Sequence, residues 1–420
     1  MRVVFTVVHR WAGLFIGVFL ILSGITGAII SWDHELDEWL NPHLFKARRE
    51  GSPKDPHELA RLVEASDPKG RVTFFSLGYE PGHTASFFVE PRVDPKTGDL
   101  YSLDYNQVYV EPSTGEIVGK RYWGAISLSS ENVLPFLYKL HYSMHIPDFA
   151  NYDRWGYVFM GIIAIVWTLD CFVGFYLTLP ARGRSADRRS RSGLRRTRWQ
   201  RWKPAWSIKR GASSYRFNLD LHRAAGLWLW ILLFILAFTA ISMNLSQEIV
   251  RPLVRTVSTL TPDAFDDVPA TPLNQQIEPK ISFEKAIEIA VKEARKRGWP
   301  DPPGSALYGL NHGLYAISFY RPEDDHGEYG MGHKMLFVDG RDASVKGGRA
   351  PWQGTPGDIF MQLQFPLHSG RIAGIPGRIA ISILGLVVAM LSITGIVVWA
   401  KKRSARLSVR RGPAVVASAK

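Results

Sequence analysis

Cysteine is almost absent from this sequence. Its 420 residues include a single cysteine, Cys171, so no disulfide can form within the chain. The Cys-x-x-Cys-His motif that attaches a haem covalently is also missing. Any haem would therefore be held by axial ligands and packing alone. Cys171 lies in an apolar stretch, where a cysteine usually acts as a small buried hydrophobic residue.

Several catalytic and nucleotide-binding motifs are missing as well. No G-x-G-x-x-G segment follows a predicted strand and opens a helix, and no Walker motif is present. The sequence therefore predicts neither a dinucleotide site nor an ATP site. It also lacks the Ser-His-Asp and paired-carboxylate patterns that would indicate a hydrolase.

Charge is missing from four long stretches. Segments 11–32, 224–247 and 379–400 contain no charged residue, and segment 155–180 contains only Asp170. Because about 20 helical residues cross the hydrocarbon core of a bilayer, we predict four transmembrane helices. The first stretch is too long for a secretory signal, and no small-residue cleavage site follows it. We expect it to remain in the mature protein.

Lysine and arginine are concentrated in two segments. Asp187 is the only acid among a dozen basic residues in segment 181–211, and segment 401–412 has no acid. Since cytoplasmic loops carry the excess of Lys and Arg, we expect both segments and both termini to be cytoplasmic. The net charge of +13 then reflects topology and attraction to the lipid bilayer. No nucleic-acid partner is predicted, because no nucleic-acid-binding fold accompanies the basic loop.

The chain reads as a duplication. The stretch HRWAGLF at His9 recurs as HRAAGLW at His222, each at the start of an apolar segment. Both halves cross the membrane in the same sense, so they form parallel repeats around a pseudo-twofold axis along the membrane normal. The predicted order is transmembrane helix 1 (1–33), exterior module 1 with a Leu-His element (34–150), transmembrane helix 2 (151–180), a basic cytoplasmic loop (181–216), transmembrane helix 3 (217–247), exterior module 2 with a Leu-His element (248–377), transmembrane helix 4 (378–400) and a basic cytoplasmic tail (401–420).

The two exterior segments are predicted to be small α+β modules. In the first, PHELARLVEASDP reads as an amphipathic helix, and the alternating runs RVTFFSLGY, TASFFVEP and SLDYNQVYVEP read as strands before the turn STGEIVG. In the second, SFEKAIEIAVKEARKRGWP reads as a helix capped by Ser282. SALYGLN, LYAISFYRP and MLFVDGRDASVKGG read as its strands.

These modules resemble PepSY domains, and the whole arrangement resembles the PepSY-associated transmembrane proteins of bacteria, some of which reduce ferric siderophores. The resemblance rests on HRWAG and HRAAG, on KLHYSMHIP and DCFVGFYLTLP around the second span, and on PLHSGRIAGIPGR before the fourth. It implies an α-helical protein of the bacterial inner membrane with two periplasmic PepSY-like modules. It also implies a membrane haem protein that moves electrons to a periplasmic acceptor.

Histidine is the usual axial ligand of a non-covalent b-type haem, and ionisable residues in membrane segments are usually functional. Four histidines occupy repeat-related positions. His9 and His222 lie near the cytoplasmic ends of spans one and three, and His141 and His368 precede spans two and four. Two matched ligands facing the pseudo-twofold axis would bind one iron, so two pairs predict two haems. A single such histidine is more often an ordinary interfacial residue, but that explanation does not account for the fourfold placement.

Other residues near these histidines have two readings each. His145 lies on the same helical face as His141, and either could be the ligand. Asp170 could accept the second ring N–H of a ligating histidine or pair with Arg10 or Arg223. The two arginines could instead neutralise haem propionates. The exterior stretch Asp324–His333, which is acidic and rich in histidine, could contact metal weakly, but a solvated loop is the better interpretation.

The predicted function is an oxidoreductase: a di-haem conduit that passes electrons to a ferric siderophore or another periplasmic ferric chelate and releases Fe(II). The electron donor would be a cytoplasmic flavoprotein reductase or membrane quinol, since no dinucleotide site is present. Two alternatives come from other classes. One is a protein that binds or transports haem or iron without redox turnover, and the other is a PepSY-based membrane regulator of proteases.

Overall fold

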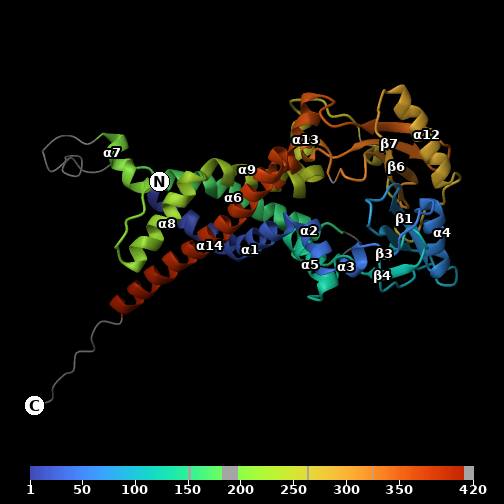
Figure 1. The fold of residues 1–420 in the computed structure, drawn as a ribbon. Helices are drawn as coiled ribbons and strands as arrows, with labels where there is room; N and C mark the ends of the chain where they lie inside the picture. Colours follow the sequence, from blue (N-terminus) through green and yellow to red (C-terminus); the bar gives the residue numbers. More distant parts are fainter. Residues whose placement is uncertain (150–152, 182–196, 263, 325, 411–420) are drawn as a thin grey trace, which may run out of the picture.

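The computed structural model describes residues 1–149, 153–181, 197–262, 264–324 and 326–410. A bundle of helices forms one end of an elongated molecule, and a β-sheet forms the other (Figure 1). The first residue and the basic end of the last helix both lie at the end of the bundle that is remote from the sheet (Figure 1). Residues 182–196 of the predicted cytoplasmic loop and residues 411–420 of the predicted tail lie outside the described residues.

Three of the predicted spans are single helices long and apolar enough to cross a membrane. They are α1 (Arg2–Ile30), α6 (Trp155–Thr178) and α14 (Gly374–Arg410). Their helical structure extends beyond the apolar runs, because α1 begins at Arg2 and α14 continues through the basic residues to Arg410. The predicted tail therefore begins as a continuation of the fourth helix.

The third predicted span is not one straight helix. It consists of α8 (Ser214–Trp228) and α9 (Trp230–Asn244), which meet at Leu229 at an angle of 72° and together have the length and hydropathy of a span. The indole nitrogen of Trp228 donates to the Trp206 carbonyl, and that of Trp230 donates to the Cys171 carbonyl. The two sides of the bend are thus tied to different elements, which the apolar sequence alone does not indicate.

The membrane helices pack closely at small residues. A Cβ atom added to Gly24 of α1 would lie 2.4 Å from the Gly385 carbonyl oxygen of α14, and the reverse substitution would place a Cβ 2.5 Å from the Gly24 oxygen. Close contact of two backbones at glycine is typical of helix pairs in membranes. Around this crossing, all four spans contribute to one buried apolar layer: Ile16, Leu20, Ile163, Leu233, Leu236, Leu384 and Val388.

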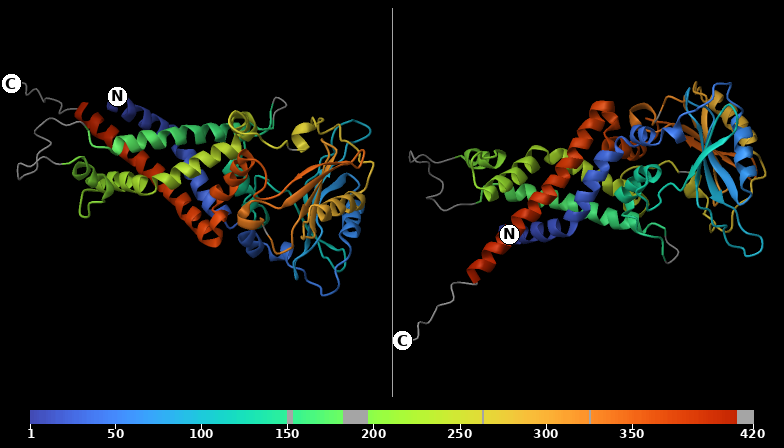
Figure 2. Two further views of the ribbon diagram at one scale, coloured as in Figure 1. Left: turned by 90° about the horizontal axis from the view of Figure 1, so that it is seen from above. Right: turned by 60° about the horizontal axis from the view of Figure 1, so that its bottom comes forward.

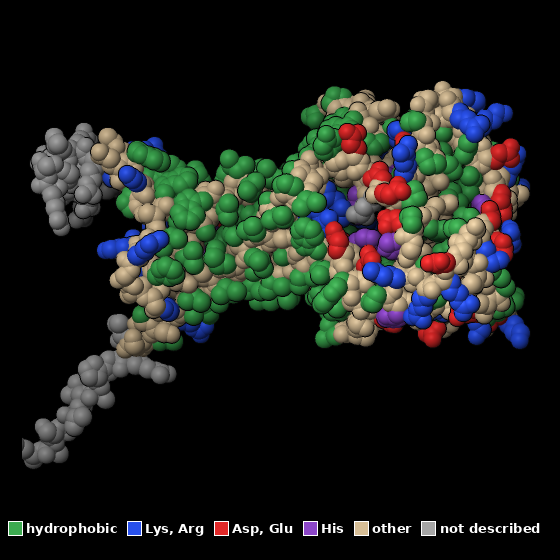
Figure 3. Space-filling model, viewed as in Figure 1, with side chains coloured by type: hydrophobic (Ala, Val, Ile, Leu, Met, Phe, Trp, Pro, Cys, Tyr) green, Lys and Arg blue, Asp and Glu red, His purple; other side chains and the backbone are tan. Residues whose placement is uncertain are grey.

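The surface of the bundle agrees with a membrane location. Hydrophobic side chains cover its visible middle section, and Lys and Arg gather at the end remote from the sheet (Figure 3). Acidic and basic side chains are mixed over the visible face of the sheet domain (Figure 3). The protein is therefore a membrane protein with one large polar domain.

The eight strands form one antiparallel sheet with the order β4-β3-β2-β1-β5-β6-β7-β8 (Figure 2). The first half of the chain contributes β1 (Gly70–Ser76), β2 (Ala85–Pro91), β3 (Gln107–Val110) and β4 (Ile117–Arg121). The second half contributes β5 (Pro303–Gly309), β6 (Leu314–Phe319), β7 (Lys334–Asp339) and β8 (Val345–Arg349). Each half carries one helix before its strands, α4 (Pro56–Ser66) and α12 (Phe283–Lys296).

The two predicted α+β modules are joined rather than separate. Strand β1 pairs with β5, with Phe75 opposite Ala306, and the two halves share one buried core that includes Leu59, Phe87, Ala290 and Ile317. This pairing covers an edge that each module would otherwise expose. Side-chain alternation predicts the faces of a strand but does not reveal its neighbour, so the sequence did not predict the fusion.

Both predicted helices of the sheet domain are present, and each has a side-chain cap at its start. The Ser282 hydroxyl accepts from the Lys285 amide at the start of α12, as predicted. At the start of α4, the Asp55 carboxylate accepts from the amides of His57 and Glu58. Capping of this kind satisfies backbone donors that have no partner within the helix.

Short helices connect the sheet to the bundle. In the first repeat these are α2 (Asp33–Leu40), α3 (Pro42–Phe45) and α5 (Ser130–Ser143). In the second repeat they include α10 (Arg251–Arg255), α11 (Ala264–Asp267) and α13 (Pro356–Ser369). Helix α7 (Arg198–Trp202) lies at the opposite end of the molecule.

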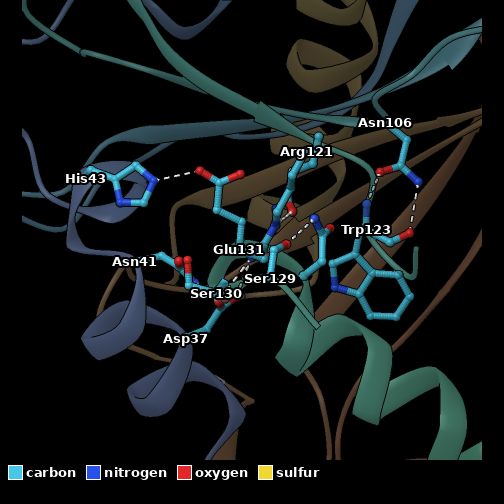
Figure 4. A network of polar contacts seen from close by, with 11 residues as sticks. Asp37, Asn41, His43, Asn106, Arg121, Trp123, Ser129, Ser130 and Glu131 are labelled. Atoms are coloured by element: carbon cyan, nitrogen blue, oxygen red, sulfur yellow. Dashed lines mark hydrogen bonds and ion pairs between the residues drawn. The ribbon is translucent and has the colours of Figure 1, made fainter. Parts of the chain in front are cut away.

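Arg121 of β4 bonds residues of the short helices α2 and α5 (Figure 4). Its guanidinium lies 2.8 Å from an Asp37 carboxylate oxygen and also donates to Gln107 and to the Glu131 carbonyl.

Replacing Arg121 by methionine is expected to destabilise the protein by about 3–5 kcal/mol, because it leaves the Asp37 carboxylate buried without its cation. The two side chains are 3% and 11% exposed. Thermal unfolding of the purified protein in detergent measures the effect. The matched control is Arg49→Ala, since Arg49 and Glu116 form an ion pair with both side chains more than half exposed and its loss should change stability by less than about 0.5 kcal/mol. Equal melting temperatures for the two variants would contradict this role for Arg121.

Candidate functional site

The four repeat-related histidines form two facing pairs. The ring centres of His9 in α1 and His222 in α8 are 6.1 Å apart. Those of His141 in α5 and His368 in α13 are 6.2 Å apart. The partners in each pair come from different halves of the chain, as expected for ligands around a pseudo-twofold axis.

The spacing suits two imidazoles that bind one iron from opposite sides. A metal–imidazole bond is about 2 Å long, and the ring centre lies about 1 Å beyond the nitrogen, so the ring centres of two such ligands lie about 6 Å apart. Both observed separations have this value. The two ring separations therefore suit one iron between the imidazoles of each pair.

The second ring nitrogen of each histidine has a hydrogen-bond partner. Nδ1 lies 3.1 Å from the Thr26 hydroxyl in His141, 3.0 Å from the Thr239 hydroxyl in His368, and 3.0 Å from the Thr394 hydroxyl in His222. In His9, Nδ1 lies 2.9 Å from each carboxylate oxygen of Asp170. Partners of this kind orient metal-binding histidines.

The threonine bonds have a defined direction. Each of the three hydroxyls lies 2.8 Å from the carbonyl oxygen four residues earlier in its own helix. A hydroxyl has one hydrogen to donate, so it accepts from the imidazole N–H. The carboxylate of Asp170 is also an acceptor. Nδ1 of each ring is therefore placed to donate its hydrogen, and a neutral ring that does so has its lone pair on Nε2, the atom that can bind a metal.

A cavity of about 1250 Å³ surrounds the pair His9 and His222. This volume exceeds the roughly 300–1,000 Å³ of usual small-molecule sites, so a group as large as a porphyrin fits. Its walls combine aromatic and basic side chains, among them Trp11, Trp167, Trp230, Trp399, Arg10, Arg223, Lys402 and Arg403. Trp230 belongs to this lining, whereas Trp228 is 55% exposed and donates to the Trp206 carbonyl.

Two arginines in this cavity have an unused donor. Within the described residues, Nε of Arg10 and Nε of Arg223 are buried without a hydrogen-bond partner. The Arg10 guanidinium lies over the Trp11 ring, while Arg223 bonds the Asp220 carboxylate at 2.9 Å. In these contacts Asp170 pairs with His9 and with neither arginine. The ion pair between Asp170 and Arg10 or Arg223, which the sequence left open, is therefore not formed here. The unused donors suit an anionic group such as a propionate.

His141 and His145 have different surroundings. The His141 ring faces His368 and contacts α1 so closely that a Cβ on Gly27 would lie 2.8 Å from its Cε1. His145 follows the end of α5 in a left-handed conformation with φ of 52°. Its Nε2 lies 2.9 Å from the Phe136 carbonyl oxygen, and its ring stacks on Phe136. The structure therefore brings His141, and not His145, opposite the second-half histidine.

The two pairs lie at different depths of the same bundle. Along α1, His9 belongs to the first pair, and Thr26 holds His141 of the second. These 17 residues span about 25 Å of helix, most of the roughly 30 Å thickness of the hydrocarbon core. The buried apolar layer to which all four spans contribute includes Ile16, Leu233 and Val388. Ile16 lies between His9 and Thr26 along α1. The two sites are therefore stacked across the membrane region.

Sequence reasoning missed the three threonines that hold these histidines in place and a buried acid that bonds two arginines. Thr26, Thr239 and Thr394 occur in GITG, AFTA and SITG, and comparing the spans of the two halves would have revealed the recurrent threonine. Asp220 is fully buried and bonds Arg216 and Arg223. Its position between arginines at i−4 and i+3 was a signal for one charged helix face.

The exterior stretch Asp324–His333 does not form a metal cluster in the part that the structure describes. Among the described residues, no group of three or more His, Cys, Asp or Glu side chains could hold a metal ion. The His333 ring stacks on Tyr320, and its Nε2 lies 3.1 Å from the Asp324 carbonyl oxygen. Burial lowers the pKa of His333, which favours the neutral ring. Asp325 lies outside the described residues.

Comparison with known proteins agrees with this arrangement. A family model described as the PepSY-associated TM region matches residues 6–402. The chain belongs to this family. The match to the PepSY-associated transmembrane family includes both histidine pairs and the sheet domain, which confirms the resemblance found in the sequence. No curated protein matches this chain.

Proposed function

We propose that this PepSY-associated protein is a di-haem electron conduit of the bacterial cytoplasmic membrane that reduces a periplasmic ferric chelate. His9 and His222 would hold one b-type haem, and His141 and His368 would hold the other. The observation that carries the proposal is the pair of 6.1 and 6.2 Å ring separations, with Nδ1 of every ring already bonded. Bound haem supplies one-electron chemistry between ferric and ferrous iron.

The residues around the histidines have separate tasks in this proposal. Threonine hydroxyls and Asp170 keep each ring in one tautomer and one orientation. Arg10 and Arg223, which both line the cavity, would pair with the propionates of the haem held by His9 and His222. The apolar layer between the pairs excludes water and ions from the middle of the bundle, so that electrons cross and other charges do not.

The proposed orientation places the histidine pair His9 and His222 on the cytoplasmic side. We call it the inner pair, and we call His141 and His368 the outer pair. Support comes from the basic residues at the end of the bundle remote from the sheet (Figure 3), since Lys and Arg are enriched on the cytoplasmic side. Both chain termini would then be cytoplasmic, and the sheet domain would face the periplasm. Membrane quinol or a cytoplasmic flavoprotein would supply electrons to the inner pair.

A pocket of about 380 Å³ is the proposed docking place for the acceptor. Phe365 and Met361 of α13 contribute to its wall, together with His326 and Arg349. Phe365 lies three residues before His368, about one helical turn away, so an acceptor in this pocket would be next to the outer pair. The Arg349 guanidinium suits an anionic chelate, and reduction to Fe(II) weakens binding by hard oxygen ligands. A ferric siderophore is the acceptor class that we favour.

The visible spectrum of the protein, purified from cells well supplied with haem, tests this function most directly. We expect sharp bands of six-coordinate haem after reduction with dithionite, and reoxidation when a ferric siderophore is added. A protein that holds haem but is not reoxidised by any ferric chelate would favour haem or iron transport over reduction. A colourless protein would contradict the proposal and leave the PepSY-based regulator of proteases as the better explanation.

A further inference from the structure

The four histidines share one arrangement, with a single departure. Three Nδ1 atoms face threonine hydroxyls, whereas Nδ1 of His9 faces the carboxylate of Asp170. Asp170 of α6 holds the histidine of α1, and Thr394 of α14 holds the histidine of α8. On the equivalent second helices of the two repeats, α6 and α14, Nδ1 of His9 therefore meets a carboxylate, whereas Nδ1 of His222 meets the neutral Thr394 hydroxyl and the Leu391 carbonyl oxygen. The inner pair thus carries a carboxylate that the outer pair lacks.

The Asp170 carboxylate is shielded from water, and the two arginines of the same cavity, Arg10 and Arg223, have other partners. Its side chain is 10% exposed, and it accepts from Nδ1 of His9. Arg223 is bonded to Asp220, a side chain with 1% exposure that also bonds Arg216. The Arg10 guanidinium lies over the Trp11 ring. In a poorly polarisable environment, an unscreened charge next to a ligand has a larger effect than it would have in water.

We propose that Asp170 is a positioning residue that lowers the reduction potential of the inner iron relative to the outer iron, and so directs electrons outward. This inference rests on the proposed function. A carboxylate that accepts the N–H of a ligating histidine makes the imidazole a stronger electron donor. Stronger donation and nearby negative charge both favour ferric iron, which carries the greater positive charge. A neutral threonine hydroxyl adds no such charge.

With both haems bound, the step would be a one-electron exchange. The group held by His9 and His222 would be oxidised, the group held by His141 and His368 would be reduced, and no bond to a substrate would be made or broken. Quinol or flavin on the cytoplasmic side would replace the electron, and the ferric chelate would be the final acceptor. With Asp170 on the inner pair, the internal transfer is downhill toward the periplasm.

A purely structural role for Asp170 would orient His9 without changing the potential, and Asp170→Asn separates the two roles. Asparagine keeps an acceptor oxygen at Nδ1 and removes the charge. We expect the variant to retain both haems and to shift the reduction equilibrium of the inner one at least tenfold toward the ferrous state, which is about 59 mV for one electron. The outer midpoint should stay unchanged. Spectroelectrochemical titration measures both values, and His222→Ala identifies the outer one because it retains the outer haem alone.

Two reciprocal variants keep the test decisive. Thr394→Asp adds a second carboxylate to the inner pair and should lower the inner midpoint further, while Thr239→Asp places one on His368 and should lower the outer midpoint. An inner midpoint that is the same in wild type, Asp170→Asn and Thr394→Asp would overturn the inference. If Asp170→Asn lost its haem, the sign of the Thr394→Asp shift would decide. A wild type without haem would refute the proposed function instead, so the two failures are distinguishable.

Discussion

Replacing His222 or His368 by alanine is expected to remove about half of the bound haem, because each substitution deletes one of the two axial ligands of a single site. The remaining site should keep its six-coordinate spectrum, since its own histidines and the residues that bond their Nδ1 atoms lie at the other depth of the bundle. Haem per polypeptide, determined after extraction into pyridine, gives the content. His9→Ala should behave like His222→Ala, and His141→Ala should behave like His368→Ala.

His145→Asn is the matched control for this series. Asparagine tolerates the left-handed backbone of residue 145, and the histidine that it replaces bonds the Phe136 carbonyl of the preceding helix, α5. This variant should keep full haem content. Loss of one haem from His145→Asn, with full content in His141→Ala, would reverse the choice between the two. Full six-coordinate content in all four alanine variants would show that these histidines are not the ligands.

Loss of either histidine pair should abolish electron transfer across the membrane, because the two sites act in series, but the two losses should differ in detail. In His222→Ala, the outer haem should still be reduced by a small reductant on the sheet side and reoxidised by a ferric siderophore there. In His368→Ala, the inner haem should accept electrons at the basic end, yet no ferric chelate on the sheet side should be reduced.

Liposomes of known orientation allow this measurement. The protein is reduced with dithionite, the excess is removed, and a ferric siderophore confined to the sheet side is added while the haem bands are followed. Wild-type haem should be reoxidised, and His145→Asn should match it. Reoxidation of His368→Ala at the wild-type rate would refute transfer in series. If wild-type haem stayed reduced with every ferric chelate, the conduit would require a different acceptor.

The sheet domain illustrates what local patterns can and cannot predict. The runs LYAISFYRP and MLFVDGRDASVKGG predicted β6, β7 and β8, because short runs rich in aromatic and β-branched residues that are bounded by turn residues are typical of strands. The pairing of β1 with β5 was not predicted. It joins strands from opposite halves of the chain, and the sequence of one strand carries no information about which distant edge will satisfy its backbone.

The third span shows the same limit within the membrane. Segment 224–247 is uniformly apolar, which predicts membrane insertion irrespective of helix shape. The 72° bend at Leu229 separates two helices whose flanking tryptophans bond Trp206 and Cys171. Hydropathy measures transfer into lipid, and it does not detect which neighbours hold the two ends of a broken helix.

The sequence by itself determined the family, the apolar spans and the set of repeat-related histidines, because hydropathy, charge runs and repeated motifs are properties of short stretches of chain. The tertiary structure alone decided the bend in the third span, the fusion of the two modules into one sheet, and the partner of each histidine Nδ1. His141 is 115 residues from Thr26, and His222 is 172 residues from Thr394. Contacts over such separations depend on how the spans pack, so a carboxylate on one histidine and hydroxyls on three become visible only when the helices are assembled.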